Sequence, residues 1–189
     1  MSAKSVSSSE PIYQLKITLR NSKPTIWRRV MVPSKFSLYK SHQVIQIAMG
    51  WTNSHLHQFI VDDQYYSIPS PEDLERVIDE RRHVLSQIAP REKRKFVYEY
   101  DFGDSWEHEI VVEKILPPET GVKYPVCLQG KRACPPEDVG GAWGYETFLA
   151  AINDPKHAEH ASYLEWIGGK FDAEEFNLDE INPALRRVK

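Results

Sequence analysis

Two stretches of alternating apolar and polar residues meet within the run Phe96-Val-Tyr-Glu-Tyr-Asp-Phe-Gly-Asp-Ser-Trp-Glu-His-Glu-Ile110. Alternation with a period of two is typical of β-strands that bury one face. The stretches are joined by Asp101-Phe-Gly-Asp-Ser105, whose Asp and Gly residues favour a tight turn. The sequence therefore predicts a β-hairpin, and the turn of this hairpin carries two carboxylates next to a tryptophan and a histidine.

The strand pattern also occurs upstream of the hairpin, at residues 12–19, 26–32, 56–61 and 65–68. Between Leu38 and Met49 the apolar residues are instead three or four positions apart, which predicts an amphipathic helix that ends at Gly50. Residues 71–82 have a helical composition with few apolar residues. The segment 117–142 is rich in Pro and Gly and is expected to be mostly coil.

Helical spacing of apolar residues returns in the last quarter of the chain, from about residue 143 to residue 189. Strands that alternate, one early helix and a helical end are typical of an α+β fold. We therefore expect a mainly antiparallel sheet with one early helix packed on it and a C-terminal helical cluster. A disordered tail at residues 1–10 precedes this single domain, which spans residues 11–189.

The composition indicates in which cellular compartment the protein is expected. No apolar run approaches the roughly 20 residues that a membrane-spanning helix needs. The first ten residues lack the apolar centre of a signal peptide, so a cytoplasmic protein without a membrane partner is expected. In that compartment Cys127 and Cys134 would be reduced thiols unless they bind a metal.

Charge is distributed unevenly along the chain. Residues 11–61 contain seven basic side chains and no acidic one, whereas residues 137–182 contain eleven acidic and two basic side chains. The basic half could bind phosphates, as nucleic-acid-binding proteins do. The alternative is that the two halves pack together and neutralise each other, because the net charge is only −3.

Five motifs occur in one order along the chain: Trp27-Arg-Arg29, Ile45-Gln-Ile-Ala-Met-Gly-Trp51, His55-Leu-His57, Tyr98-Glu-Tyr-Asp-Phe-Gly-Asp-Ser-Trp-Glu-His108 and Cys134-Pro-Pro-Glu-Asp-Val-Gly-Gly141. Together they resemble the plasmid pRiA4b ORF-3-like family of small bacterial and archaeal proteins. The resemblance implies an α+β fold and a cytoplasmic protein, and it brings no activity, cofactor or catalytic residue. Some relatives carry a label that links them to transposons and resolvases, which favours DNA as a partner.

The hairpin and the segment Pro135-Pro-Glu-Asp-Val-Gly-Gly141 supply the first candidate site. Its members are acidic or aromatic: Asp101, Asp104, Trp106, His108, Glu137 and Asp138. His108 could act as a base oriented by the carboxylates, or these groups could bind a metal. Strand alternation instead places His108 with the buried residues, and turn geometry already explains Gly103 and Asp104. Asp101 is left without a structural reason.

Two further sets of residues are weaker candidates. His55 and His57, two positions apart on an expected strand, would point the same way and could bind zinc with Cys127 and Cys134. The spacing of the cysteines is wider than in common zinc sites, and the alternative is a packed histidine with two free thiols. Neither cysteine has a sequence feature that would activate it for catalysis.

Nucleic acid could be contacted by the basic side chains Lys16, Arg20 and Lys23. The sequence contains no helix-turn-helix or zinc-finger spacing. Arg28 and Arg29 are neighbours on an expected strand, so both cannot face solvent. One of them is expected to pair with a carboxylate, for which the acidic C-terminal quarter is a candidate source.

Two functions follow from these patterns. The first is a small non-enzymatic binding or accessory module, related to nucleic acid or mobile elements, with no cofactor. The second is a metal-dependent hydrolase that uses Asp101, Asp104 and His108 together with Glu137 and Asp138. Convergence of these side chains in space would favour the second.

Overall fold

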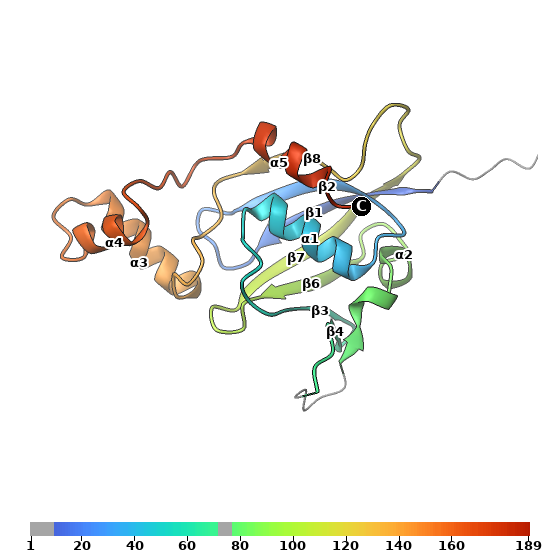
Figure 1. Cartoon of the computed structure of the whole chain (residues 1–189), viewed down its shortest axis with the longest axis horizontal. Helices are drawn as coiled ribbons and strands as arrows, with labels where there is room; N and C mark the ends of the chain where they lie inside the picture. Colours follow the sequence, from blue (N-terminus) through green and yellow to red (C-terminus); the bar gives the residue numbers. More distant parts are fainter. Residues whose placement is uncertain (1–9, 72–76) are drawn as a thin grey trace, which may run out of the picture.

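The computed structural model describes residues 10–71 and 77–189 and shows an α+β protein built on one sheet (Figure 1). The sheet order is β5-β4-β3-β6-β7-β1-β2-β8, and every neighbouring pair is antiparallel except β4 and β5. The strands are β1 (Ile12–Leu19), β2 (Trp27–Pro33), β3 (His57–Val61), β4 (Gln64–Ser67), β5 (Ile78–Asp79), β6 (Lys95–Tyr100), β7 (Trp106–Leu116) and β8 (Val126–Lys131).

The predicted hairpin is confirmed as β6 and β7, which pair from Lys95 opposite Val111 to Tyr100 opposite Trp106. Alternate residues of β7 are buried, as the sequence pattern predicts: Trp106, His108, Ile110 and Val112. Hence His108 belongs to the core.

The predicted early helix is confirmed as α1 (Leu38–Met49), which crosses the sheet in Figure 1. Ser37 caps its start because the Ser37 hydroxyl accepts a hydrogen bond from the Lys40 N–H at 3.2 Å. Gly50 ends it in the left-handed conformation, with φ of +101°. The buried side of α1 packs with the apolar face of β1 and β2 in one core.

The C-terminal helices lie in two places rather than in the single cluster expected at residues 143–189. Helices α3 (Gly141–Asn153) and α4 (His160–Trp166) lie together at one end of the molecule, whereas α5 (Leu178–Leu185) lies beside β8 (Figure 1). Asn182 of α5 exchanges two hydrogen bonds with the Cys127 backbone of β8, at 2.8 and 3.1 Å. Leu185 is fully buried. These contacts join residues more than 50 positions apart, so helical periodicity alone does not reveal them.

Two segments differ from the sequence expectation. The expected coil at 117–142 contains β8, an edge strand that pairs with β2 and therefore shows little alternation. The described part of the segment 71–82 forms β5 and the 3₁₀ turn η1 (Glu80–Arg82), followed by the short helix α2 (Leu85–Ile88). Residues 72–76 of this segment and residues 1–9 of the expected tail lie outside the described residues.

Candidate carboxylate–histidine site

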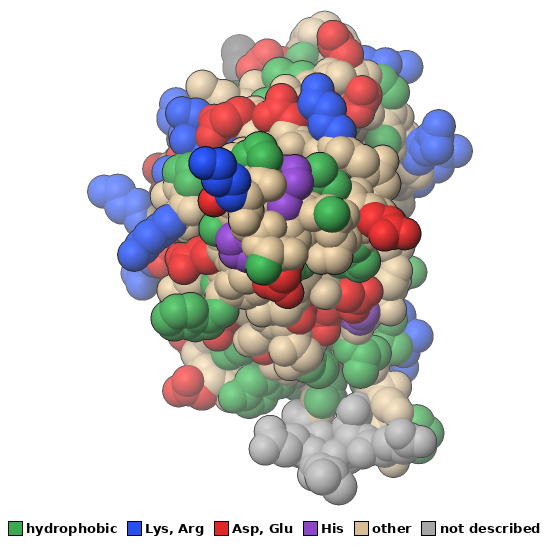
Figure 2. Space-filling model, turned by 90° about the vertical axis from the view of Figure 1, so that its left-hand side faces the viewer, with side chains coloured by type: hydrophobic (Ala, Val, Ile, Leu, Met, Phe, Trp, Pro, Cys, Tyr) green, Lys and Arg blue, Asp and Glu red, His purple; other side chains and the backbone are tan. Residues whose placement is uncertain are grey.

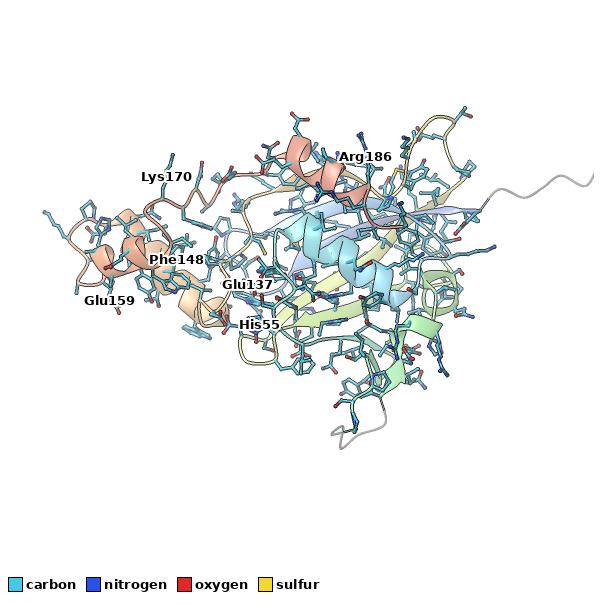
Figure 3. All side chains as sticks on the ribbon, viewed as in Figure 1. His55, Glu137, Phe148, Glu159, Lys170 and Arg186 are labelled. Atoms are coloured by element: carbon cyan, nitrogen blue, oxygen red, sulfur yellow. The ribbon has the colours of Figure 1, made fainter. Side chains whose placement is uncertain are left out.

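Three loops converge at the end of the sheet nearest α3. They are the segment between α1 and β3, the turn between β6 and β7, and the segment between β8 and α3. His55 comes from the first loop, Asp101 from the second, and Glu137 and Asp138 from the third. Figure 3 shows His55 and Glu137 together at the junction between the sheet and α3. The structure therefore brings together three of the acidic residues singled out in the sequence, around a histidine whose spacing in the sequence suggested zinc binding with the cysteines.

Nε2 of His55 is the centre of this site. It lies 3.3 Å from Asp138 Oδ1, 3.7 Å from Asp101 Oδ2 and 3.7 Å from Glu137 Oε2. This nitrogen atom is buried and has no hydrogen-bond partner among the described residues. Since a buried polar atom without a partner is costly, its surroundings call for an explanation.

Asp101 is held in place by the turn itself. Its backbone takes the left-handed conformation with φ of +57°, which few residues other than Gly adopt readily. Its Oδ1 atom accepts the backbone N–H of Gly103 at 3.0 Å and, more weakly, that of Asp104 at 3.4 Å. One carboxylate oxygen therefore stabilises the turn, and the other, Oδ2, faces His55.

Glu137 is oriented by donors from two other segments. Its Oε1 atom accepts the backbone N–H of Thr52 at 2.9 Å and the Thr52 hydroxyl at 3.1 Å. The Tyr100 hydroxyl donates to the same carboxylate at 3.1 Å, and burial raises the pKa of Tyr100 to about 12, so this hydroxyl keeps its proton. Glu137 Oε2 is then directed toward His55.

Asp104 lies next to the cluster and has a structural role. Its carboxylate accepts the backbone N–H of Gly140 at 3.1 Å, just before α3 begins. At Gly141, whose φ is +67°, a Cβ atom would come within 2.6 Å of the Asp104 carbonyl oxygen. Only Gly allows the hairpin turn and the start of α3 to approach this closely. The contact fixes Asp138 relative to Asp101.

The aromatic members of the first candidate set lie behind the site. His108 is fully buried, its Nδ1–H donates to the Tyr98 carbonyl at 3.2 Å, and burial lowers its pKa to about 4. Trp51 contacts both the His108 ring and the Trp106 ring, at centroid distances of 5.1 and 6.2 Å. His108 and Trp106 therefore support the cluster from the core and do not contribute ligand atoms to it.

The residues considered for zinc do not assemble. His57 begins β3 and contacts Glu80 at 3.0 Å, and its ring stacks on His42, whereas His55 lies in the preceding loop. Burial raises the pKa of Cys127 to about 11 and raises that of Cys134 well above its ordinary value, so both thiols keep their protons. Within residues 10–71 and 77–189, the one group of potential metal ligands that meets is His55, Asp101 and Asp138.

The basic candidates lie apart from this cluster. Lys16 is 5.4 Å from the centre of the Trp27 ring, Arg20 forms an ion pair with Glu107 at 2.7 Å, and Lys23 is exposed. One neighbouring arginine is buried, as expected: Arg28 donates to four backbone carbonyls, including those of Ala48 and Arg132.

Arg29 has the carboxylate partner, but that partner is not in the C-terminal quarter. The partner is Glu113 of β7, at 2.6 Å, and this contact lowers the pKa of Glu113. The basic first half of the chain is thus neutralised in part by β7.

The sequence singled out His55 as a candidate metal ligand but grouped it with His57 and the cysteines, because its three carboxylate neighbours are 46 or more positions away. The sequence feature that pointed to this site was Asp101, which the hairpin turn does not explain and which therefore needs a partner from elsewhere in the chain.

Comparison with known proteins agrees with this architecture. A crystal structure of a protein of unknown function, MM3350 from Methanosarcina mazei Go1, is similar to the chain with a TM-score of 0.82 and 36% identity, covering 91% of this chain and 98% of the other. The uncharacterized protein y4hQ of Sinorhizobium fredii (strain NBRC 101917 / NGR234) is 43% identical over 176 residues, which are 92% of this chain and 90% of that protein. No described helix combines the length and apolar character required to cross a membrane. Residues 11–180 match the plasmid pRiA4b ORF-3-like proteins, and the chain belongs to this family.

Proposed function

We propose that the chain binds a divalent transition-metal ion through His55, Asp101 and Asp138, with Glu137 as a fourth donor. One observation carries this proposal: a buried imidazole nitrogen without a hydrogen-bond partner faces oxygen atoms of three carboxylates at 3.3–3.7 Å. Bonds of about 2.0–2.2 Å to a tetrahedral metal ion separate its ligand atoms by about 3.3–3.6 Å. The distance from Nε2 to Asp138 falls within that range, and the distances to Asp101 and Glu137 are about 0.1 Å longer.

The type of donor favours particular ions. One imidazole with several carboxylates suits Mn²⁺, Fe²⁺ or Zn²⁺, whereas Ca²⁺ and Mg²⁺ prefer oxygen ligands alone. Asp101 and Asp138 both have positive φ, at +57° and +58°, a conformation that Asp adopts more readily than most residues.

The metal content of purified protein tests the proposal. We expect chelator-treated protein to take up one equivalent of Mn²⁺ or Zn²⁺, measured by mass spectrometry after removal of free ion. His55→Ala should abolish this uptake, and Asp101→Asn should weaken it. Glu146→Gln is the matched control, because Glu146 is an exposed carboxylate on α3 away from the cluster. Equal uptake by His55→Ala and Glu146→Gln would contradict the proposal.

Hydrolysis assisted by the bound ion is the second candidate function. The side chain of Asp138 is 71% exposed, so the site opens to solvent on that side and leaves room for a metal-bound water. Two loops of the site also carry an exposed apolar side chain that could contact a substrate: Leu56 and Phe102.

Metal-loaded protein should then cleave an activated phosphodiester or ester faster than the free ion does, and His55→Ala should remove the difference. If full occupancy gives no rate above that of the free ion with either substrate, the site binds metal without this chemistry.

A further inference from the structure

A surface cavity of about 340 Å³, open to solvent, borders the carboxylate–histidine cluster on the side of α4. Asp138 belongs to both the cluster and the cavity wall. The other lining residues come from the segment before α3, from the N-cap of α4 and from α4 itself: Val139, Glu159, Ser162, Tyr163 and Trp166. Cavities of this size accommodate small molecules rather than protein surfaces.

Two aromatic rings with fixed orientations line this cavity. The Tyr163 and Trp166 rings are 6.2 Å apart between centroids and nearly perpendicular, with an angle of 79°. Both rings pack edge-on against Phe148, which is fully buried, at 5.6 and 5.8 Å. The core thus holds one side of each ring, while Trp166 remains 47% exposed. Packing alone does not require such a large exposed ring.

The charge of the cavity is negative. Asp138 and Glu159 line it, and no Lys or Arg is found among its described lining residues. Neither carboxylate forms an ion pair with Lys or Arg within the described residues. In Figure 2, which faces the end formed by α3 and α4, hydrophobic side chains gather in the lower half next to acidic ones.

We propose that this cavity binds the alkylammonium group of a small molecule. Aromatic rings attract such cations through their electron-rich faces, and aromatic cages recognise quaternary ammonium groups. Binding of the ammonium group does not require the metal ion. Because Asp138 is shared, a ligand held here lies next to the metal cluster, which makes a small amine the substrate class for that site if the ion is bound.

Choline tests this proposal by calorimetric titration, with 3,3-dimethyl-1-butanol as its neutral isostere of the same shape. We expect saturable binding of one choline, and binding of the isostere weaker by about tenfold or more because the charge is missing. Trp166→Leu and Glu159→Gln should each weaken choline binding by several-fold. Trp143→Leu is the matched control, since Trp143 is 84% exposed on α3 and does not line the cavity.

This experiment tests the metal proposal and the ammonium proposal independently of each other. His55→Ala should lose the metal and keep choline, whereas Glu159→Gln should keep the metal and lose affinity for choline. Glu159 is an exposed carboxylate, so its substitution leaves the fold intact even if Trp166→Leu is unstable. The ammonium proposal is overturned by equal binding of choline and its isostere, by the absence of saturable choline binding, or by unchanged binding in Glu159→Gln.

Discussion

At the scale of single residues, two histidines among the described residues have a buried ring nitrogen without a hydrogen-bond partner, but their surroundings differ. Nε2 of His55 faces three carboxylates in a half-buried loop, which favours a cation. Nε2 of His108 is enclosed by aromatic rings in the core, which favours a neutral imidazole. Burial and neighbouring charge therefore give these two histidines different roles.

The buried histidines make the free energy of unfolding depend on pH. Burial lowers the pKa of His108 from 6.5 to about 4, and that of His42, which also stacks on His57, to about 3. Between pH 4 and 6.5 the unfolded chain therefore binds more protons than the folded one, so stability falls as pH falls through this range. Above pH 6.5 these imidazoles are neutral in both the folded and the unfolded state, so the free energy of unfolding no longer depends on their protonation.

His108→Gln should remove part of this dependence. We expect its stability, measured by urea unfolding from pH 7.5 to pH 4, to fall less than that of the wild type by on the order of 2–3 kcal/mol. Above pH 7 the two proteins should show the same slope, which serves as the internal control. Parallel curves over the whole range would show that His108 is not held neutral by the fold.

At the scale of elements, the site depends on how closely the β6–β7 turn approaches the start of α3. The Asp104 carboxylate and the Gly140 N–H join the two at 3.1 Å, and Gly141 lies against the Asp104 carbonyl. Asp101 precedes this contact and Asp138 lies just before Gly140, so the distance between the two carboxylates is set here.

Gly141→Ala should therefore weaken both the fold and the metal site. The added Cβ would meet the Asp104 carbonyl oxygen at 2.6 Å, and we expect a loss of about 1–3 kcal/mol in unfolding free energy together with weaker metal binding. Gly121→Ala is the control: φ there is +83° but nothing lies within 4 Å of the added carbon. If both variants lose equal stability and keep the metal, the close approach is not what positions the site.

The same elements show what the sequence can predict. Periodicity predicted β6, β7, α1 and β1 because each of them buries one face. One-sided burial produces a regular spacing of apolar residues within a short stretch of sequence. It missed β8, which lies at the edge of the sheet, and the docking of α5 on β8. The members of the candidate site could be predicted only in part: the sequence singles out Asp101, Glu137 and Asp138 together, but their proximity to His55 depends on contacts between distant loops.

At the scale of the whole molecule, two regions of the eight-stranded sheet differ in charge. Arg20, Arg29 and Lys95 lie in ion pairs with β7, at 2.7, 2.6 and 3.1 Å, so this part of the sheet is close to neutral. The carboxylates of the proposed metal site and of the proposed ammonium site meet at the end formed by the loops and α3. Nucleic-acid binding through Lys16, Arg20 and Lys23 stays a prediction, and the acidic end is the surface that we expect to bind cations.

The most direct test of the metal site is anomalous X-ray diffraction from crystals of the protein grown with Mn²⁺ or Zn²⁺. We predict one strong anomalous peak, about 2.0–2.2 Å from Nε2 of His55 and from carboxylate oxygens of Asp101 and Asp138, and its absence in His55→Ala crystals. Two results would contradict the central claim that these side chains form a metal site. One is an ordered cluster of side chains without an anomalous peak, and the other is an anomalous peak that marks an ion bound elsewhere on the chain.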